Sequence, residues 1–136
     1  MTDSPVRVRL RRELEAHMAQ LGYSCARSMR ADLLAPEIVR ASLVRGRIAY
    51  GETVLRNDLR RRQCHERLLI FSRRRTRRHS SILFFIGVAE ADQPALETLL
   101  QQLDIRSRVR GGHVHVVPIA AEPEAARRRA MTANVG

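Results

Sequence analysis

The apolar run ILFFIGVA, residues 82–89, constrains the fold of this chain more than any other segment. Successive side chains of a β-strand point to opposite faces of its sheet, so a strand of this composition is apolar on both faces. Such strands are typical of a sheet that helices cover on two sides. With eight residues, the run is also well short of the roughly 18–20 residues that span a bilayer. We therefore predict a buried strand inside an α/β domain.

Helical and extended patterns alternate around this run. Helices are expected at residues 7–22, from Asn57 or Asp58 to about Phe71, and at 90–105. Extended segments are expected at 23–28, 29–35, 46–55 and 113–119. Residues 37–45 fit a strand, a hairpin arm or a helical turn. The order αβββαβαβ predicts a single α/β domain over residues 1–119, with a mixed central sheet flanked by helices, and residues 120–136 are expected to form a loose tail.

Charge is the second constraint. The net charge is +11, all 25 basic residues are arginine, and ten arginines between Arg56 and His79 face only two carboxylates in that segment. Such a concentration of positive charge favours binding of a polyanion. The planar guanidinium group of arginine can donate two hydrogen bonds to one phosphate. Because only five residues are aromatic, we expect contact with backbone phosphates rather than with stacked bases.

The segment from residue 56 to 78 is therefore predicted to bind DNA or RNA. The arginines expected to make the contacts are Arg56, Arg60, Arg61, Arg62, Arg73, Arg74, Arg75, Arg77 and Arg78. An acidic partner protein, an anionic membrane surface or simple hydration of the arginines would explain the same charge. The alternative function is thus a non-enzymatic basic interaction module.

A carboxylate stands on an apolar strand face in GRIAYGETVL, residues 46–55. In an extended segment Ile48, Tyr50, Glu52 and Val54 share one face. Burying a charged Glu52 among these side chains is costly unless it is paired. Two interpretations stay open: a metal site, or an ion pair with an arginine of a neighbouring strand or of the following helix.

The order αβββαβ, with ADLLA at 31–35, GRIAYGETVL at 46–55 and the helix opening NDL at 57–59, resembles the PD-(D/E)XK nuclease-like superfamily. The resemblance covers about residues 10–90, and its motifs are short. It implies the restriction-endonuclease-like fold and metal-dependent cleavage of nucleic acid. It further implies that Asp32 and Glu52 are catalytic residues that together hold Mg²⁺. The simpler interpretation of Asp32 is a surface ion pair with Arg30.

The sequence departs from this pattern where the superfamily usually has a lysine, two residues after the Glu. Val54 stands at that position, and the chain contains no lysine that could replace it. An arginine could supply charge, but with a pKa above about 12 it is a poor proton acceptor. The two hypotheses are therefore an atypical Mg²⁺-dependent DNA endonuclease, which is a phosphodiesterase, and a catalytically degenerate relative that only binds nucleic acid.

The remaining signals concern surroundings and metal ions. Cys25 and Cys64 have no paired spacing, and the first residues lack the apolar core of a signal peptide, so we expect a cytoplasmic protein with reduced thiols. A bacterial source is also expected. His113 and His115 are expected to share one face of the last strand, as polar residues of an edge rather than as zinc ligands. A homodimer stays open, because small nucleases often pair.

Overall fold

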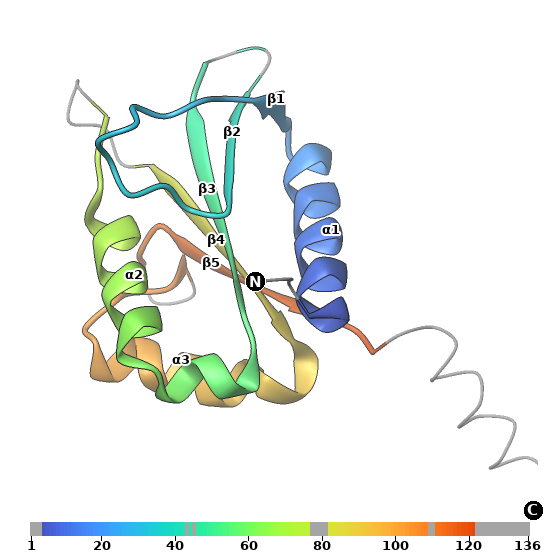
Figure 1. Ribbon diagram of the computed structural model, residues 1–136, viewed down its shortest axis with the longest axis vertical. Helices are drawn as coiled ribbons and strands as arrows, with labels where there is room; N and C mark the ends of the chain where they lie inside the picture. The colour runs from blue at the N-terminus through green and yellow to red at the C-terminus, as the bar shows by residue number, and fades with distance from the viewer. Residues whose placement is uncertain (1–3, 43, 45, 77–81, 109–110, 122–136) are drawn as a thin grey trace, which may run out of the picture.

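The computed structural model describes residues 4–42, 44, 46–76, 82–108 and 111–121 (Figure 1). The helical elements are α1 (Pro5–Gln20), the short 3₁₀ helix η1 (Arg56–Arg60), α2 (Arg62–Arg73), the 3₁₀ turn η2 (Glu90–Asp92) and α3 (Gln93–Gln102). The strands are β1 (Tyr23–Ala26), β2 (Ile38–Ser42), β3 (Ile48–Val54), β4 (Leu83–Ala89) and β5 (Val114–Ile119). The predicted α/β class, with a mixed sheet flanked by helices, is confirmed.

The five strands form one sheet in the order β1-β2-β3-β4-β5. The pairs β1–β2 and β2–β3 are antiparallel, whereas β3–β4 and β4–β5 are parallel. Parallel neighbours need a crossover connection, and α2 and α3 supply the two crossovers. Both of these helices lie on one face of the sheet, and α1 covers the other face (Figure 1).

The central run divides its side chains between two apolar cores, as its composition predicts. Phe84, Ile86 and Val88 of β4 pack with residues of α2 and α3 such as Leu68 and Leu96. Phe85 points the other way and joins Leu10, Leu14 and Met18 of α1. On the α1 face β3 carries Gly51, where an added Cβ would lie 3.0 Å from both Ile38 Cβ and Met18 Sδ, so the close packing of α1 depends on a glycine.

Two predicted elements differ from the structure. Residues 29–35 form an irregular connection instead of a strand, and Leu33 and Leu34 stay 43% and 45% exposed. The second strand is β2, which lies within the segment that the sequence left ambiguous. The helix expected from Asn57 or Asp58 begins only at Arg62, because η1 intervenes and the Asp58 carboxylate accepts the Leu55 N–H instead of capping α2.

The last part of the chain is described only in part. Of the predicted tail, 120–136, residues 122–136 lie outside the described residues, as do Arg77 and Arg78 of the predicted nucleic-acid-binding set. Among the described residues, none of the helices combines the length and the apolar composition that crossing a membrane requires.

Candidate functional site

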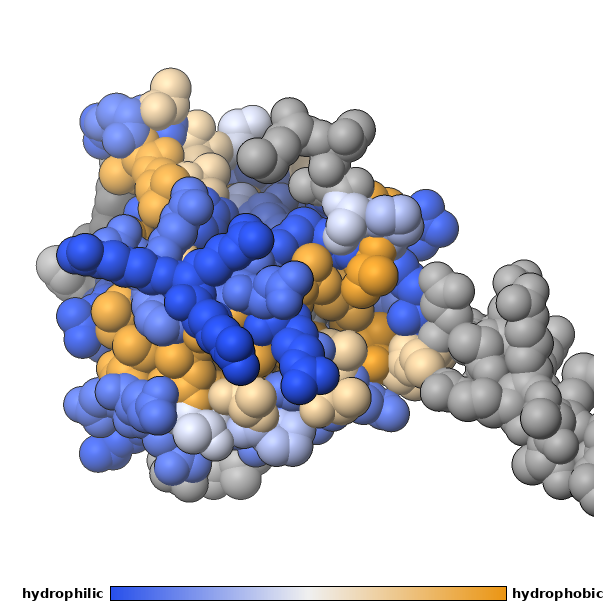
Figure 2. All heavy atoms as spheres, turned by 60° about the horizontal axis from the view of Figure 1, so that its bottom comes forward, coloured by the Kyte–Doolittle hydropathy of each residue, from blue (hydrophilic) through white to orange (hydrophobic). Residues whose placement is uncertain are grey.

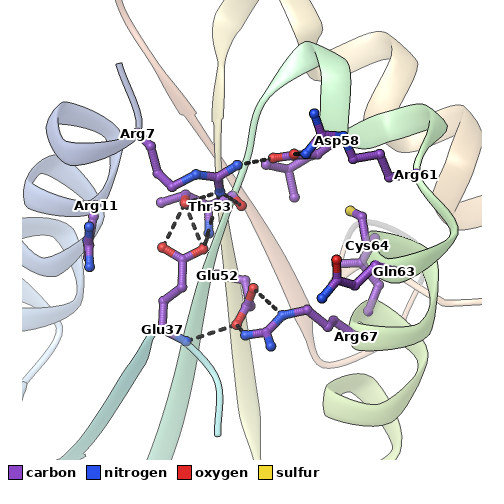
Figure 3. Close-up of a pocket in the computed structure, with 12 residues that line it drawn as sticks. Arg7, Arg11, Glu37, Glu52, Thr53, Asp58, Arg61, Gln63, Cys64 and Arg67 are labelled. Carbon is purple, nitrogen blue, oxygen red and sulfur yellow. Dashed lines mark hydrogen bonds and ion pairs between the residues drawn. The ribbon is translucent and has the colours of Figure 1, made fainter. Parts of the chain in front are cut away.

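A cleft of about 330 Å³ lies where β2 begins and β3 ends (Figure 3). Residues from both helical layers reach it, because β2 begins opposite Gly51 and leaves the last residues of β3 without a strand partner on that edge. Polar and charged side chains make up most of its lining. They are Arg7 and Arg11 of α1, Glu37 directly before β2, Glu52 and Thr53 of β3, and Asp58, Arg61, Gln63 and Arg67 from η1 to α2.

Glu52 lies on the face of β3 that α2 covers, and its side chain is only 7% exposed. Arg67 of α2 donates to both carboxylate oxygens, over 2.6 Å to Oε1 and 3.3 Å to Oε2. The backbone N–H of Glu37 donates to Oε1 over 2.9 Å. Burial nevertheless raises the pKa of Glu52, and the Arg67 guanidinium opposes this shift. Of the two interpretations that the sequence left open for Glu52, the structure shows the ion pair with an arginine of the following helix.

Arg67 joins three parts of the chain at this point. Besides Glu52, its Nη2 donates to the backbone carbonyl of Ala35 over 3.2 Å, and its guanidinium lies 5.0 Å from the centroid of the Phe71 ring. It therefore ties α2 to β3 and to the connection that leads into β2. An arginine suits this role because its planar fork donates several bonds in fixed directions.

The next residue, Thr53, faces the opposite layer. Arg7 of α1 donates through Nη1 to the Thr53 carbonyl over 3.1 Å and to Thr53 Oγ1 over 3.0 Å. The Thr53 hydroxyl and N–H both bind the Glu37 carboxylate, 2.7 Å and 3.0 Å from its Oε1. Through Nη2, Arg7 also binds Asp58 Oδ2 over 2.5 Å. Arginines of α1 and α2 thus hold all the carboxylates that line the cleft.

Asp32 lies outside this cleft, which corrects the predicted pairing with Glu52. Its carboxylate is 62% exposed and accepts from Arg30, over 3.1 Å from Nε and 2.9 Å from Nη2. The cause is the irregular connection at 29–35, which places Asp32 in a loop and not on a strand beside β3. The structure brings Glu37 to Glu52 instead, because β2 pairs with β3 in the register Ile38 to Gly51.

Sequence reasoning missed both Glu37 and Arg7. The signal for Glu37 was its place directly after Pro36 at the start of the ambiguous segment. Once Ile38 is opposite Gly51, Glu37 falls beside Glu52. No comparable signal exists for Arg7, which meets Thr53 across 46 residues of sequence.

The residues of the cleft do not fit the Mg²⁺ ion that the resemblance implies. Mg²⁺ takes carboxylate oxygens and water in an octahedral arrangement, whereas here guanidinium and N–H groups occupy the carboxylates. Val54, at the position of the usual lysine, is 1% exposed and part of the apolar core. Within the described residues no three His, Cys, Asp or Glu side chains gather in a way that could hold a metal ion.

Cys64 also lines the cleft, and it is not an activated nucleophile. Burial raises the pKa of its thiol to about 11, and the neighbouring carboxylates of Asp58 and Glu52 add to the shift. The thiolate is the reactive form, and a thiol with so high a pKa is almost entirely protonated at neutral pH. Cys25 and Cys64 are both free thiols.

The predicted nucleic-acid-binding arginines divide into three groups. Those of η1 and of the first residues of α2 are exposed, namely Arg56, Arg60, Arg61 and Arg62, and so are Arg73 and Arg75 near the end of α2. Arg74 differs, because it donates to the Leu34 carbonyl over 2.6 Å and lies over the Tyr50 and Phe71 rings. Arg77 and Arg78 lie outside the described residues. Figure 2 shows strongly hydrophilic side chains spread across the face at the lower end of Figure 1.

The histidines lie differently from the prediction that they share a face. His113 precedes β5, and its Nε2 is 2.8 Å from the Ser72 carbonyl at the end of α2. His115 lies within β5 and packs against Phe85, which belongs to the α1 face, with 4.7 Å between the ring centroids.

No family model, no curated protein and no solved structure matches this chain. The PD-(D/E)XK resemblance therefore stays a prediction from the residues.

Proposed function

We propose that this protein binds nucleic acid through backbone phosphates and does not cleave it, as a nuclease-like domain in which arginines neutralise the carboxylate cleft. The observation that carries the proposal is the ion pair of Glu52 with Arg67. Arg67 holds the Glu52 carboxylate, the residue at the usual lysine position is the buried Val54, and the chain has no lysine. The described residues of the cleft therefore offer Glu52 no partner that could help it to activate water.

The exposed arginines support the binding half of the proposal. Arg56, Arg60, Arg61 and Arg62 are exposed on η1 and at the start of α2, and Arg61 also lines the cleft. All five aromatic residues are buried, at no more than 8% exposure, so none of their rings is available for base stacking. We therefore expect such a surface to contact the phosphate groups of the nucleic acid. Contacts of this kind carry little sequence preference.

Binding to duplex DNA and duplex RNA, measured by fluorescence anisotropy over a series of salt concentrations, tests the proposal. The logarithm of the binding constant should fall linearly with the logarithm of the salt concentration. In Arg56→Gln/Arg60→Gln the slope should become shallower by about 0.9 for each phosphate that the variant no longer neutralises.

The matched control is Arg27→Gln/Arg47→Gln, which removes the same charge. Arg27 directly follows β1 and Arg47 directly precedes β3, whereas Arg56 and Arg60 lie beyond its other end. Equal slopes in the two double variants would show that net charge alone attracts DNA. Cleavage of DNA with Mg²⁺ or Mn²⁺ that is lost in Glu52→Gln would overturn the non-catalytic half. Binding of an acidic polypeptide, with no binding of DNA or RNA at low salt, would instead favour a protein partner.

A further inference from the structure

A second hollow, of about 560 Å³, lies at the far end of α2 from the cleft. Three arginines line it, Arg73 and Arg75 near the end of α2 and Arg106 in the connection after α3, together with His113. Among the described residues of its lining, Asp104 supplies the one carboxylate. This balance differs from that of the cleft, where Glu37, Glu52 and Asp58 are each paired with an arginine.

Short contacts hold the walls of this hollow in place. His113 Nε2 donates to the Ser72 carbonyl over 2.8 Å, since a carbonyl oxygen can only accept, and this bond joins the approach to β5 to the end of α2. The N–H of Gly112 donates to the Ser107 carbonyl over 2.9 Å. A Cβ at Gly112 would lie 2.0 Å from the Arg106 carbonyl oxygen, so only glycine allows this approach. The backbone of Arg106 therefore lies directly against Gly112 at the edge of the hollow.

Two of the three arginines of the hollow are open to a ligand. Arg73 and Arg106 are exposed, and neither makes an ion pair with a residue in the described part of the chain. Guanidinium groups that line one hollow from two elements suit a phosphate, because each can donate two parallel hydrogen bonds. A volume of this size accommodates a phosphate group together with ordered water.

We propose that this hollow binds a phosphate group of the nucleic-acid backbone and forms a second contact point besides the arginines of η1. The proposal rests on the proposed function. The 12 residues of α2 separate the two points by about 18 Å, which corresponds to about five phosphate steps along one strand. Between them, the outer side of α2 carries Glu66 and Ile70, so the contact is made at two points and not along a continuous basic stripe.

The test compares Arg73→Gln/Arg106→Gln with Arg12→Gln/Arg27→Gln. Arg12 lies on α1, across the sheet from α2, and Arg27 follows β1, the edge strand farthest from β5. Binding is measured over a salt series with a duplex of about 16 base pairs, which exceeds the expected span. In a parallel experiment inorganic phosphate is titrated while the ring signals of His113 are followed by NMR.

A shallower salt slope in the hollow variant than in the control supports the proposal. Equal slopes, with wild-type binding intact, overturn the hollow as a contact point and leave the proposed function standing. If the wild type binds no DNA but inorganic phosphate shifts the His113 signals, and Arg73→Gln/Arg106→Gln abolishes that shift, the hollow is a site for a free phosphate ester and the proposed function falls. If neither ligand binds, both proposals fail.

Discussion

Arg67 donates to both carboxylate oxygens of Glu52, 2.6 Å and 3.3 Å away, on a face of β3 whose other side chains belong to the apolar core. This relationship decides between the two interpretations that the sequence left open for Glu52. A buried carboxylate needs a compensating charge, and an arginine from the following helix supplies it. The same contact occupies both oxygens that the PD-(D/E)XK resemblance assigns to a metal ion.

Replacing Arg67 by alanine should lower the free energy of unfolding by about 3 kcal/mol, because it leaves Glu52 buried without a partner. Urea denaturation followed by circular dichroism measures the loss. The control is Arg62→Ala on the same helix. Arg62 is 3.2 Å from its partner Glu66, and the Arg62 side chain is 91% exposed. That pair should contribute less than about 1 kcal/mol. Equal losses in the two variants would contradict the structural role of Arg67.

The raised pKa of Glu52 predicts how stability changes with pH. Its ordinary value is 4.5, and burial raises it in the folded state. Between the two values the folded state binds more protons than the unfolded state, so stability falls as pH rises through that window. The free energy of unfolding, relative to that of Glu52→Gln, should therefore be greatest below pH 4.5 and decline above it. Urea titrations at a series of pH values measure this difference. If the free energy of unfolding, relative to that of Glu52→Gln, rose with pH above 4.5, the result would contradict a raised pKa of Glu52.

The thiol of Cys64 should resist alkylation. With a pKa of about 11 instead of 9.0, its thiolate fraction at pH 8 is about 100-fold smaller than that of an ordinary thiol. Iodoacetamide labelling followed by mass spectrometry should show very slow modification at Cys64, which accelerates as the pH is raised toward 11. The urea-unfolded protein is the control, in which Cys64 should label at the ordinary rate. Rapid labelling of the folded protein would mean that the cleft activates the thiol.

Glu66 should weaken binding of nucleic acid. It is exposed on α2 between the two arginine groups and pairs with Arg62. Glu66→Gln removes a charge that repels phosphate and releases Arg62, so the affinity for duplex DNA should increase several-fold at low salt and less at high salt. Glu13→Gln on α1 is the matched control, since Glu13 is also exposed on a helix but belongs to the other layer. An equal gain from both substitutions would argue against contact along α2.

The fold was more predictable than the site, for reasons that particular residues show. The two-sided apolar pattern of β4 is local, so the sequence alone places this strand inside the sheet. Glu52 also stands out locally, as one carboxylate among apolar neighbours. Its partners do not, because Arg67 is one arginine among many and Arg7 is distant in sequence. Asp32 was misplaced because Leu33 and Leu34 resemble part of a strand, although the structure leaves both partly exposed.

Glu52 and Thr53 are consecutive residues of β3, yet they bind helices on opposite faces of the sheet, α2 through Arg67 and α1 through Arg7. We therefore expect this single peptide unit to couple the two helical layers during local unfolding. The N–H of Thr53, held by Glu37, should exchange its hydrogen only in openings that disturb both layers together. The end of β3 is thus expected to open cooperatively with the whole domain, although it lies beside a cleft.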